Sequence, residues 1–246
     1  MSYTIQGKTA LVTGANRGIG KAIVEALIAQ GAKRIYAAAR DIESLQALVT
    51  QAPEVIVPVQ LDVTKAGDIA NIVTLVGQLD ILINNAGIAT GSDFSGAASL
   101  AIATDEMATN YFGVISLTHA LLPILHKSNG AAVINVSSIA GIANFPTLGP
   151  YSASKAAVHS FTQGLRAEVR KANIAVVGVY PGPVATRMTE GFEMDKAAPA
   201  DVANAVLTGL KNGEEDVFPD AFSQAMYQVF LQSPKQLEQQ FAATLG

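Results

Sequence analysis

The chain of 246 residues contains no cysteine and no tryptophan. The absence of cysteine excludes disulfide bonds, thiolate catalysis and cysteine-based zinc sites. Histidine is scarce as well, and the three that occur (His119, His126 and His159) lack the spacing of an HExxH metal motif. We therefore predict no metal site and expect each histidine to lie on a helix surface.

Charged residues make up only 15% of the chain, and the net charge of −4 comes without a basic stripe, which argues against a nucleic-acid partner. No uninterrupted apolar run reaches the ~18 residues of a membrane span. Residues 1–6 have neither the basic start nor the apolar run of a signal peptide. We expect a cytoplasmic protein without a membrane or nucleic-acid partner.

Half of the residues are hydrophobic, which is enough for one sizeable core. Short β-rich apolar runs alternate with longer helical patterns, as is typical of βαβ units and a parallel sheet. The expected strands are 8–13, 34–38, 55–61, 80–84, 131–136, 174–180 and a short one at 216–219. The expected helices are 18–30, 42–51, 66–76, 100–126, 151–171, 199–211, 221–232 and 234–243.

Pro58 interrupts the third expected strand, and proline is tolerated mainly at a sheet edge. In the doubly wound order 3-2-1-4-5-6 the third strand is an edge strand. We therefore predict one α/β domain over residues 1–246, built on a doubly wound parallel sheet of six to seven strands flanked by helices.

The first expected strand runs into a glycine-rich turn, TGANRGIG at 13–20, and then into a helix. Such a turn lets the backbone approach a pyrophosphate, and the helix N-terminus offers free N–H groups to it. The alternative is an ordinary strand-to-helix turn. A P-loop is excluded, because Ala15 replaces its first glycine and Ala22 replaces the Ser or Thr that would hold magnesium.

Tyr151 and Lys155 lie four residues apart, so on a helix they share one face. A cation beside a phenol favours the phenolate, and we expect it to lower the Tyr151 pKa and allow proton transfer near neutral pH. Such a pair also arises by chance. Its weight comes from Ser137 and Ser138, which precede it by little more than a dozen residues.

TGANRGIG, NNAG at 84–87, Asn110, Ser138, YSASK at 151–155 and PGPVAT at 181–186 occur in the order seen in short-chain dehydrogenases/reductases. The chain resembles this family over about residues 7–211. The resemblance implies a single-domain Rossmann fold, a nicotinamide cofactor and the interconversion of a carbonyl and an alcohol by hydride transfer.

The resemblance also implies roles for four residues. Tyr151 would donate the proton, Ser138 would polarise the carbonyl, and Lys155 would lower the Tyr151 pKa and bind the nicotinamide ribose. Asn110 would hold its helix open around a water that relays protons to Lys155. Ser152 and Ser154 are expected to point to other helix faces and have no role. The residues expected to contact the cofactor are Gly14, Asn16, Arg17, Gly18, Ile19, Gly20, Arg40, Asp62, Val63, Asn84, Ala86, Gly87, Tyr151, Lys155, Pro181, Gly182, Val184 and Thr186.

Ala39 follows the second expected strand, at the position where NAD-binding folds place an acid for the ribose 2′-hydroxyl. Arg40 follows it, and Arg17 lies inside the glycine turn. Two guanidinium groups can hold a 2′-phosphate through charge-assisted hydrogen bonds, so we predict NADP(H). A shift of one residue would instead place Asp41 at the ribose and favour NAD.

The resemblance places a substrate lid at about 187–200 and a second wall of the substrate site at 140–149, with Phe145 as a contact. It also implies a homodimer or homotetramer that acts on a small carbonyl or alcohol. The expected C-terminal helices, 221–243, depart from the family pattern and put a tetramer built through the last strand in doubt. Two alternatives remain: a non-catalytic NADP(H)-sensing protein, and an isomerase or dehydratase on the same scaffold.

Overall fold

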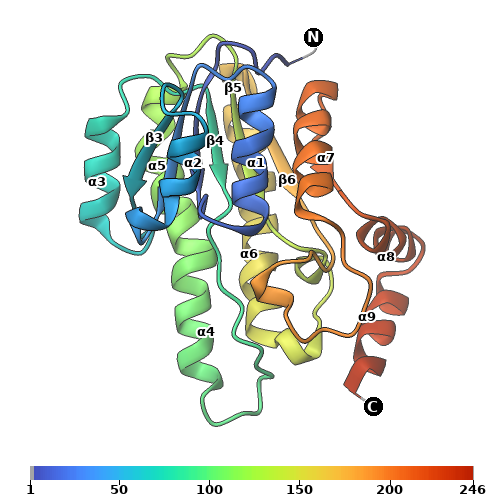
Figure 1. Ribbon diagram of the computed structural model, residues 1–246. Coiled ribbons are helices and arrows are strands. Elements are labelled where there is room, and N and C mark those ends of the chain that lie inside the picture. The colour runs from blue at the N-terminus through green and yellow to red at the C-terminus, as the bar shows by residue number, and fades with distance from the viewer. Residues whose placement is uncertain (1–2, 246) are drawn as a thin grey trace.

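In the computed structural model, which describes residues 3–245, seven parallel strands form one sheet in the order β3-β2-β1-β4-β5-β6-β7 (Figure 1). Residues 1, 2 and 246 of the expected domain lie outside the described part of the chain. Residues 1 and 2 also belong to the segment 1–6, which the sequence distinguishes from a signal peptide. The strands are β1 (Thr9–Thr13), β2 (Arg34–Ala39), β3 (Ile56–Gln60), β4 (Ile81–Asn84), β5 (Ala131–Val136), β6 (Ile174–Val179) and β7 (Asp216–Val217). This is the predicted doubly wound Rossmann-type sheet.

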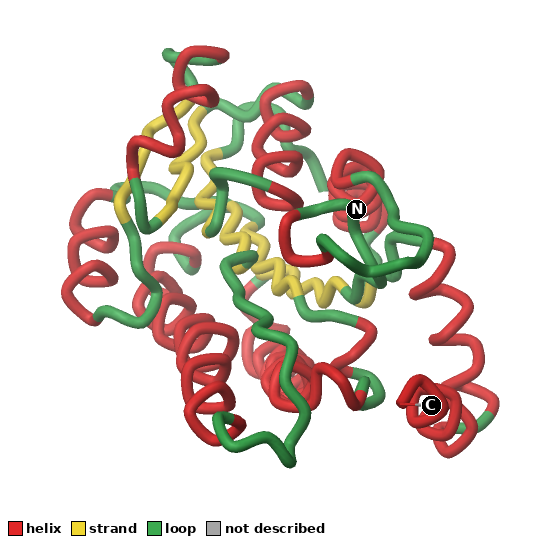
Figure 2. The backbone as a smooth tube through the Cα atoms, turned by 60° about the horizontal axis from the view of Figure 1, so that its bottom comes forward, coloured by secondary structure: helices red, strands yellow, loops and turns green. Residues whose placement is uncertain are grey.

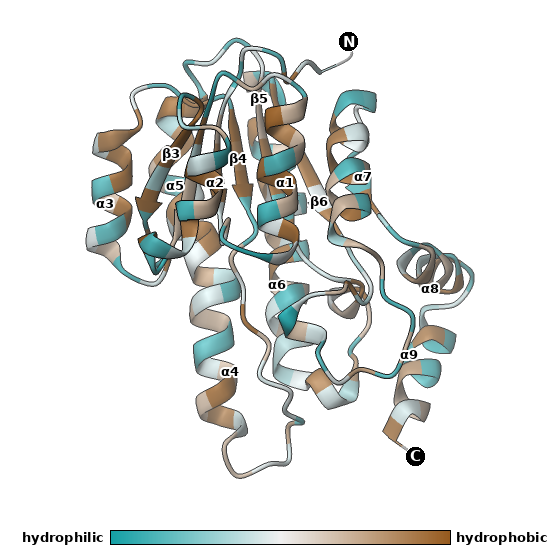
Figure 3. Cartoon of the chain, viewed as in Figure 1, coloured by the Kyte–Doolittle hydropathy of each residue, from teal (hydrophilic) through white to brown (hydrophobic). Residues whose placement is uncertain are grey.

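Helices cover both faces of the sheet, as Figure 2 shows from the side on which the strands end. One face packs against α1 (Gly18–Ala29), α2 (Gln46–Gln51) and α7 (Pro199–Asn212). The other packs against α3 (Ala66–Leu75), α5 (Gly113–Leu125) and α6 (Gly149–Val169). Strands buried on both faces are apolar on both, which explains their continuous hydrophobic runs in sequence and in Figure 3.

β3 is an edge strand, and Pro58 pairs with Ala37 of β2. No strand pairs with the outer side of β3, so the absence of an N–H group at Pro58 costs no hydrogen bond there. Two expected helices differ from prediction at their starts. The stretch 42–51 opens with a 3-10 turn, Ile42–Leu45, which Asp41 caps through a hydrogen bond from the Glu43 N–H. α6 begins at Gly149 rather than 151, because Pro150 suits a first helical turn.

The expected helix 100–126 consists of three parts: α4 (Ser99–Met107), a π turn (Ala108–Phe112) and α5. In Figure 1, α4 extends beyond the edge where the strands end. Over Ser99–Leu125 the helical stretch has the length and mean hydropathy of a membrane span, although its apolar residues are interrupted by polar ones. Leu117, Leu121 and Leu125 are buried against the sheet, and core helices meet the same criterion. It is therefore weak evidence for a membrane.

After the two-residue β7, α8 (Ala221–Gln232) and α9 (Pro234–Ala242) form a separate layer beside the sheet edge (Figure 1). Leu237 and Phe241 of α9 are buried against Ile139, the residue that follows Ser138. The ring of Phe241 also meets Phe145 edge-on at 5.2 Å. The C-terminal helices thus rest on the loop that leaves β5, next to the expected catalytic serine.

Candidate active site

The fold brings the four expected catalytic residues to the carboxyl edge of β4 and β5, the edge where open α/β sheets bind ligands. Gly87, just after β4, lies where a Cβ atom would come within 3.2 Å of Asn110 Oδ1 and 3.4 Å of Lys155 Nζ. One glycine thus adjoins two of the four side chains. Lys155 Nζ lies 5.7 Å from the centre of the Tyr151 ring, as expected for residues one helical turn apart.

Lys155 is a buried lysine, with only 4% of its surface exposed. Its Nζ donates a hydrogen bond of 2.8 Å to the carbonyl oxygen of Val136, the last residue of β5. Burial disfavours the charged form and lowers the Lys155 pKa to about 8. Near neutral pH this amine can therefore both hold and release a proton.

The expected decrease in the Tyr151 pKa is wrong for this geometry. The phenol is enclosed although part of the ring stays accessible, and burial raises its pKa to about 12. A hydrogen bond with Ser138 acts to lower the pKa, and the charge of Glu106 acts to raise it. Burial is the largest of these influences, so it outweighs the Ser138 hydrogen bond and keeps the phenol protonated near neutral pH.

The adjacent serines, Ser137 and Ser138, make different contacts. Ser137 Oγ donates to the carbonyl oxygen of Lys155 at 2.9 Å and so fixes α6 against β5. Ser138 is at the start of a 3-10 turn, Ile139–Gly141, where its Oγ accepts from the Ala140 N–H at 3.2 Å. Its hydroxyl is the one that reaches the Tyr151 phenol. This geometry agrees with the choice of Ser138 over Ser137.

Asn110 lies within the π turn and is completely buried. Its Oδ1 accepts from the Ile88 N–H at 2.8 Å, and its Nδ2 donates to the Ile88 carbonyl at 2.9 Å. Nδ2 also donates to Ser154 Oγ at 2.9 Å, so Ser154 faces Asn110, and the expectation that it points away from the site was wrong. Ser152 faces the other wall of the site: its Oγ accepts from the Phe145 N–H at 3.1 Å.

The glycine turn fits a bound pyrophosphate. Gly14 and Gly18 have φ of +63° and +54°, values that favour glycine. A Cβ at Gly20 would lie 2.2 Å from the Gly14 carbonyl oxygen, so the helix start can approach the turn only without a side chain. Asn16, Arg17 and Ile19 lie between these glycines, on the same turn.

Asn85, which is not among the expected cofactor contacts, joins β4 to this turn. Its Nδ2 donates to the carbonyl oxygens of Thr13 (2.8 Å) and Gly14 (3.3 Å). Thr13 Oγ1 in turn accepts from the backbone N–H groups of Asn85 and Ala86. The amide of Asn84, expected at the cofactor, instead donates to Thr118 and Asn135 inside the core. Asn84 therefore contributes structure rather than a side-chain contact to the site.

Arg17, Arg40 and Arg187 form a cluster of positive charge. Burial and then the charges of Arg187 and Arg40 lower the Arg17 pKa, which places the three guanidinium groups near one another. Within residues 3–245 none of the three forms an ion pair with an acidic side chain. Arg187 was not foreseen, because its sequence neighbours assign it to the lid. Such a cluster suits a phosphate.

Ala39 is the last residue of β2, and Arg40 follows it exposed. Asp41 is instead occupied in capping the following 3-10 turn. Asp62 is likewise held locally: burial acts to raise its pKa, but hydrogen bonds from Thr64 Oγ1 and N–H, together with the charges of Lys65 and Arg40, outweigh this and lower it. Next to it, Val63 packs against Gly113 at the start of α5.

The PGPVAT segment closes the site on the other side. The Pro181 carbonyl accepts from the Ile139 N–H at 3.0 Å and from Ser138 Oγ at 3.4 Å. A Cβ at Gly18 would lie 3.0 Å from Thr186 Cγ2, so this segment touches the glycine turn. Val184 forms a bridge with Ala197, and this bridge closes the base of the expected lid.

Gly182 has a partner in the C-terminal layer. Its N–H donates at 2.8 Å to Oδ2 of Asp220, whose Oδ1 accepts from the Ser223 N–H and so caps α8. A Cβ at Gly182 would lie 2.7 Å from Asp220 Oδ1. One aspartate thus connects the divergent helices to the segment expected to bind the nicotinamide.

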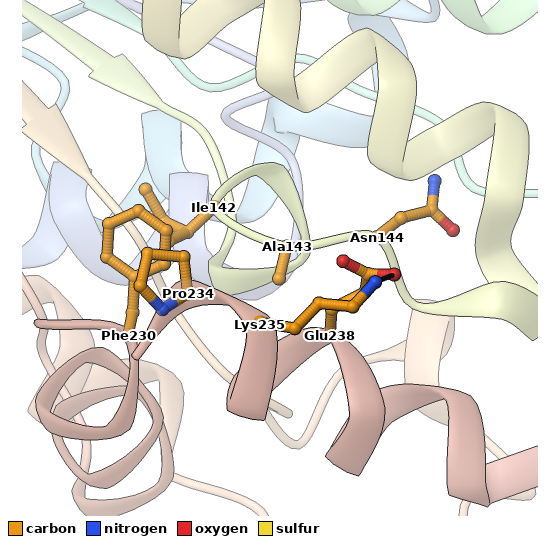
Figure 4. Close-up of a pocket in the computed structure, with 7 residues that line it drawn as sticks. All are labelled: Ile142, Ala143, Asn144, Phe230, Pro234, Lys235 and Glu238. Carbon is orange, nitrogen blue, oxygen red and sulfur yellow. Dashed lines mark hydrogen bonds and ion pairs between the residues drawn. The ribbon is translucent and has the colours of Figure 1, made fainter. Parts of the chain in front are cut away.

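A pocket of about 530 Å³ lies between the loop after Ser138 and the C-terminal helices (Figure 4). It is lined by Ile142, Ala143, Asn144, Phe230, Pro234, Lys235 and Glu238. None of the four expected catalytic side chains lines it, so it adjoins the candidate site rather than forming it. The loop that lines this pocket belongs to the segment 140–149, which is expected to form a wall of the substrate site. Phe145 of that segment packs against Phe241.

Within the described residues no three His, Asp or Glu side chains are placed to share a metal ion. His159 lies behind the site, where its Nδ1 is 2.7 Å from the hydroxyl of the buried Tyr180. It is therefore partly buried and paired with a core residue, rather than on a helix surface as expected. Burial is the main cause that lowers its pKa.

Residues 8–197 match the family model described as short chain dehydrogenase. A short-chain dehydrogenase from Burkholderia cenocepacia, solved in complex with NADP, has a TM-score of 0.91 and 35% identity, covering 97% of this chain and 99% of that one. An NADP-dependent 3-hydroxy acid dehydrogenase of Schizosaccharomyces pombe is 30% identical over 237 residues, 88% of this chain and 92% of that protein. A 3-ketodihydrosphingosine reductase of Bacteroides thetaiotaomicron is 33% identical over 223 residues, 86% of this chain and 78% of that protein.

The chain belongs to the short-chain dehydrogenase/reductase family. It is therefore an oxidoreductase that binds a nicotinamide cofactor and acts on small-molecule substrates. The site fits that cofactor on its own geometry. Gly14, Gly20 and Gly87 leave room at the edge of the sheet that side chains would fill, and the arginine cluster offers charge for phosphate.

Proposed function

We propose that the protein is an NADP(H)-dependent carbonyl reductase that reduces a ketone or aldehyde to an alcohol, and catalyses the reverse reaction when the alcohol is supplied. One observation carries the proposal: the Tyr151 phenol, the Ser138 hydroxyl and the buried amine of Lys155 converge where the glycine turn meets β4. A proton donor, a carbonyl-polarising hydroxyl and a proton reservoir are what carbonyl reduction requires.

The bound reduced nicotinamide would supply the hydride that reaches the carbonyl carbon. Tyr151 then gives its phenolic proton to the carbonyl oxygen, which takes the electron pair of the C=O bond. A pKa of about 12 keeps this phenol protonated at neutral pH, the form that reduction needs. Ser138 donates a hydrogen bond to the same oxygen, and the Lys155 amine returns a proton to Tyr151.

The preference for NADP(H) rests on Arg17, Arg40 and Arg187, which form no ion pair with an acidic side chain among residues 3–245, and on the capping role that occupies Asp41. The NADP bound in the Burkholderia cenocepacia structure and the NADP dependence of the Schizosaccharomyces pombe enzyme support it. The cofactor would lie along the glycine turn, with Gly87, Lys155 and Thr186 at its nicotinamide end.

Two relatives are named after substrates that have a hydroxyl or keto group at carbon 3. We therefore place 3-oxo compounds first among substrates. The assay is NADPH consumption by the purified protein with 3-oxo esters, diketones, simple ketones and aldehydes, and NADPH formation from NADP⁺ with 3-hydroxy acids. Tyr151→Phe is run beside the wild type.

Turnover that disappears in Tyr151→Phe, with NADPH affinity within a few-fold of wild type, is the expected result. Turnover retained in this variant would overturn the role of Tyr151. Tight NADPH binding without turnover on any substrate of the panel would favour the alternative of a non-catalytic NADP(H) sensor. The proton-donating group and its buried lysine argue against that alternative, because a sensor needs neither.

We also propose a cytoplasmic homodimer or homotetramer. Leu100 of α4 and Phe112 of the π turn are exposed by 82% and 57%, and both lie in the helical stretch by which family members associate. The two residues of β7 offer little for a tetramer built through that strand. Light scattering after size-exclusion chromatography gives the mass, and a monomeric mass would refute the proposal.

A further inference from the structure

A hydrogen-bonded cluster of polar side chains lies behind the candidate site, and the reaction proposed for this protein does not use it. Its centre is Tyr180, which follows β6 and is completely buried. The Tyr180 hydroxyl lies 2.7 Å from His159 Nδ1 and 3.3 Å from Asp216 Oδ1. Arg166 donates to Asp216 Oδ1 at 2.8 Å and to the Val176 carbonyl at 3.1 Å. Buried polar groups that satisfy one another in this way fix one arrangement of the elements that carry them.

The Tyr180 hydroxyl donates its proton to His159. A distance of 2.7 Å is typical of an O–H donor and short for an N–H donor. Burial is the largest influence on the His159 pKa and lowers it, while Asp216 raises it and Arg166 lowers it. Because the pKa is lowered on balance, the imidazole is neutral near neutral pH, and its Nδ1 can accept the proton of the phenol.

β6 leaves room for this hydroxyl. Residues 178 and 180 project from the same side of the extended chain, because side chains alternate along a strand. A Cβ atom at Gly178 would collide with the Tyr180 hydroxyl oxygen. The ring therefore lies back along the strand, over a position that only glycine leaves open. On its face it stacks on Phe218, with the ring centres 5.1 Å apart. The direction of the Tyr180 side chain is thus fixed on several sides.

The residue after Tyr180 reaches the expected catalytic serine. It is Pro181, whose carbonyl oxygen accepts from the Ile139 N–H at 3.0 Å and from Ser138 Oγ at 3.4 Å. Pro181 is also the first residue of PGPVAT, the segment expected to hold the nicotinamide. Because Tyr180 is buried and hydrogen-bonded, it anchors the start of this segment.

His159 connects this anchor to the helix of the catalytic pair. Tyr151, Lys155 and His159 are spaced four residues apart on α6, so they lie along one face of the helix. The first two are expected to act on the substrate and the cofactor, and the third holds Tyr180. One helix face therefore carries the proton donor, the buried amine and the anchor of the cofactor segment.

We propose that His159 is a positioning residue for the cofactor: through the Tyr180 hydroxyl it fixes the PGPVAT segment relative to Tyr151 and Lys155. The inference rests on the proposed function, which places the nicotinamide at this segment. The contact between His159 and Tyr180 should therefore affect the binding of the cofactor and not only the stability of the fold.

The test is a double-mutant cycle on NADPH affinity, which needs no substrate. Kd for NADPH is measured by cofactor fluorescence, and Tm by circular dichroism, for His159→Leu, Tyr180→Phe and the variant with both changes. His159→Asn is the conservative variant, because its amide oxygen lies as many bonds from the backbone as Nδ1 does. Thr162→Val is the control. Thr162 is buried in the next turn of α6, and its Oγ1 accepts from Asn135 of β5 at 3.0 Å.

His159→Leu and Tyr180→Phe should each raise Kd for NADPH by about 3–10-fold, as for the loss of one hydrogen bond. The double variant should raise it no further than Tyr180→Phe, because the two residues act through one contact. His159→Asn should bring Kd back to within about two-fold of the wild type. Thr162→Val should lower Tm by about 2–4 °C and leave Kd unchanged.

Three results would refute the proposal. The first is an unchanged Kd in the folded variants His159→Leu and Tyr180→Phe. The second is a set of additive losses in the double variant, or no recovery in His159→Asn, because the hydrogen bond would then not carry the effect. The third is a rise of Kd in Thr162→Val as large as in His159→Leu at the same loss of Tm, because general loosening of α6 would explain both. If His159→Leu does not fold, Tyr180→Phe and His159→Asn decide between the outcomes.

The cycle and the proposed function fail separately. If the substrate panel gives no turnover but the two residues are coupled in NADPH binding, the carbonyl reductase proposal fails and the positioning role of His159 stands. If turnover depends on Tyr151 but Kd does not respond to either residue, the reductase stands and the role of His159 is refuted.

Discussion

The side-chain nitrogen of Asn110 lies 2.9 Å from the hydroxyl oxygen of Ser154, 44 residues further along the chain. Ser154 is the neighbour of Lys155 in α6, and its hydroxyl also donates to the Tyr151 carbonyl at 2.7 Å. The contact therefore joins the π turn to the helix that carries both the phenol and the amine. It sets the depth at which the two elements meet.

Ser154→Ala should slow turnover without weakening cofactor binding. The change leaves Asn110 Nδ2 with the Ile88 carbonyl alone, at a cost of about 1 kcal/mol. For a chain of this size that lowers Tm by about 2–4 °C. Because the π turn can then shift relative to Lys155, we expect kcat to fall by about 3–10-fold. NADPH affinity should stay within about two-fold, since no cofactor contact is removed.

Ser152→Ala is the matched control. Ser152 is also buried in α6, but its hydroxyl binds the backbone of Phe145. It should cost similar stability with a smaller loss of kcat. Equal losses of kcat in the two variants would show that Asn110 needs no partner on α6. Thermal unfolding and steady-state kinetics on one substrate give both readouts.

The sequence predicts those parts of the site that depend on local spacing. Tyr151 and Lys155 are one turn apart on any helix, and the glycines of 14–20 restrict that turn wherever it lies. Pro58 likewise predicts the position of its strand, since an edge is the place that tolerates it. These features were therefore predictable before any tertiary contact was known.

What the sequence does not predict depends on direction and burial across long separations. Ser154 was assigned away from the site because its helix face was known but the neighbour on that face was not. The Tyr151 pKa was expected to fall because the cation could be located from spacing. The opposing desolvation depends on how the surrounding elements enclose the phenol, which spacing does not reveal.

Lys155→Met should change the pH dependence of stability. The unfolded chain holds the lysine proton up to a pKa of about 10.5, whereas the folded protein releases it at about 8. Between these values the unfolded state binds more protons, so the stability contributed by Lys155 rises with pH and is lost as pH falls through 8. Relative to Lys155→Met, the wild type should gain about 2.5 kcal/mol between pH 7 and pH 10.

Urea unfolding of both proteins at pH 7, 8.5 and 10 measures this difference. Lys171→Met, an exposed lysine just beyond the same helix, serves as the control. A constant difference between wild type and Lys155→Met at all three values would mean that burial does not depress the lysine pKa. The role of Lys155 as a proton reservoir near neutral pH would then be refuted.

Arg40→Ala should separate the two nicotinamide cofactors. If Arg40 and Arg17 hold a 2′-phosphate, removal of one guanidinium loses a charge-assisted contact, and Kd for NADPH should rise by about 10–100-fold. Kd for NADH should change by less than about three-fold, since NADH has no phosphate at that position. Quenching of cofactor fluorescence on titration with protein measures both constants.

Arg34→Ala is the control, because Arg34 is exposed at the opposite end of the same strand β2. It should leave both constants unchanged. Similar losses for NADPH and NADH in Arg40→Ala would mean that Arg40 supports the turn in general. Tighter binding of NADH than NADPH by the wild type would refute the predicted NADP(H) preference itself.

Asp220→Asn should disconnect the C-terminal helices from the cofactor segment. The aspartate uses one oxygen for the Gly182 N–H and the other for the Ser223 N–H at the start of α8. Asparagine has a single acceptor oxygen and can satisfy one of them. The loss of a hydrogen bond to a charged group costs about 1.5–3 kcal/mol, which should lower Tm and raise Kd for NADPH by about three-fold or more.

Ser233→Ala separates the two effects. Ser233 caps α9 through a hydrogen bond from the Gln236 N–H but does not touch the PGPVAT segment. The lost helix cap should cost about 1 kcal/mol of stability and so lower Tm somewhat less than Asp220→Asn does, and NADPH affinity should stay unchanged. If Asp220→Asn weakens NADPH binding and Ser233→Ala does not, the divergent helices act on the site through Gly182. If neither does, α8 and α9 stabilise the fold without reaching the cofactor.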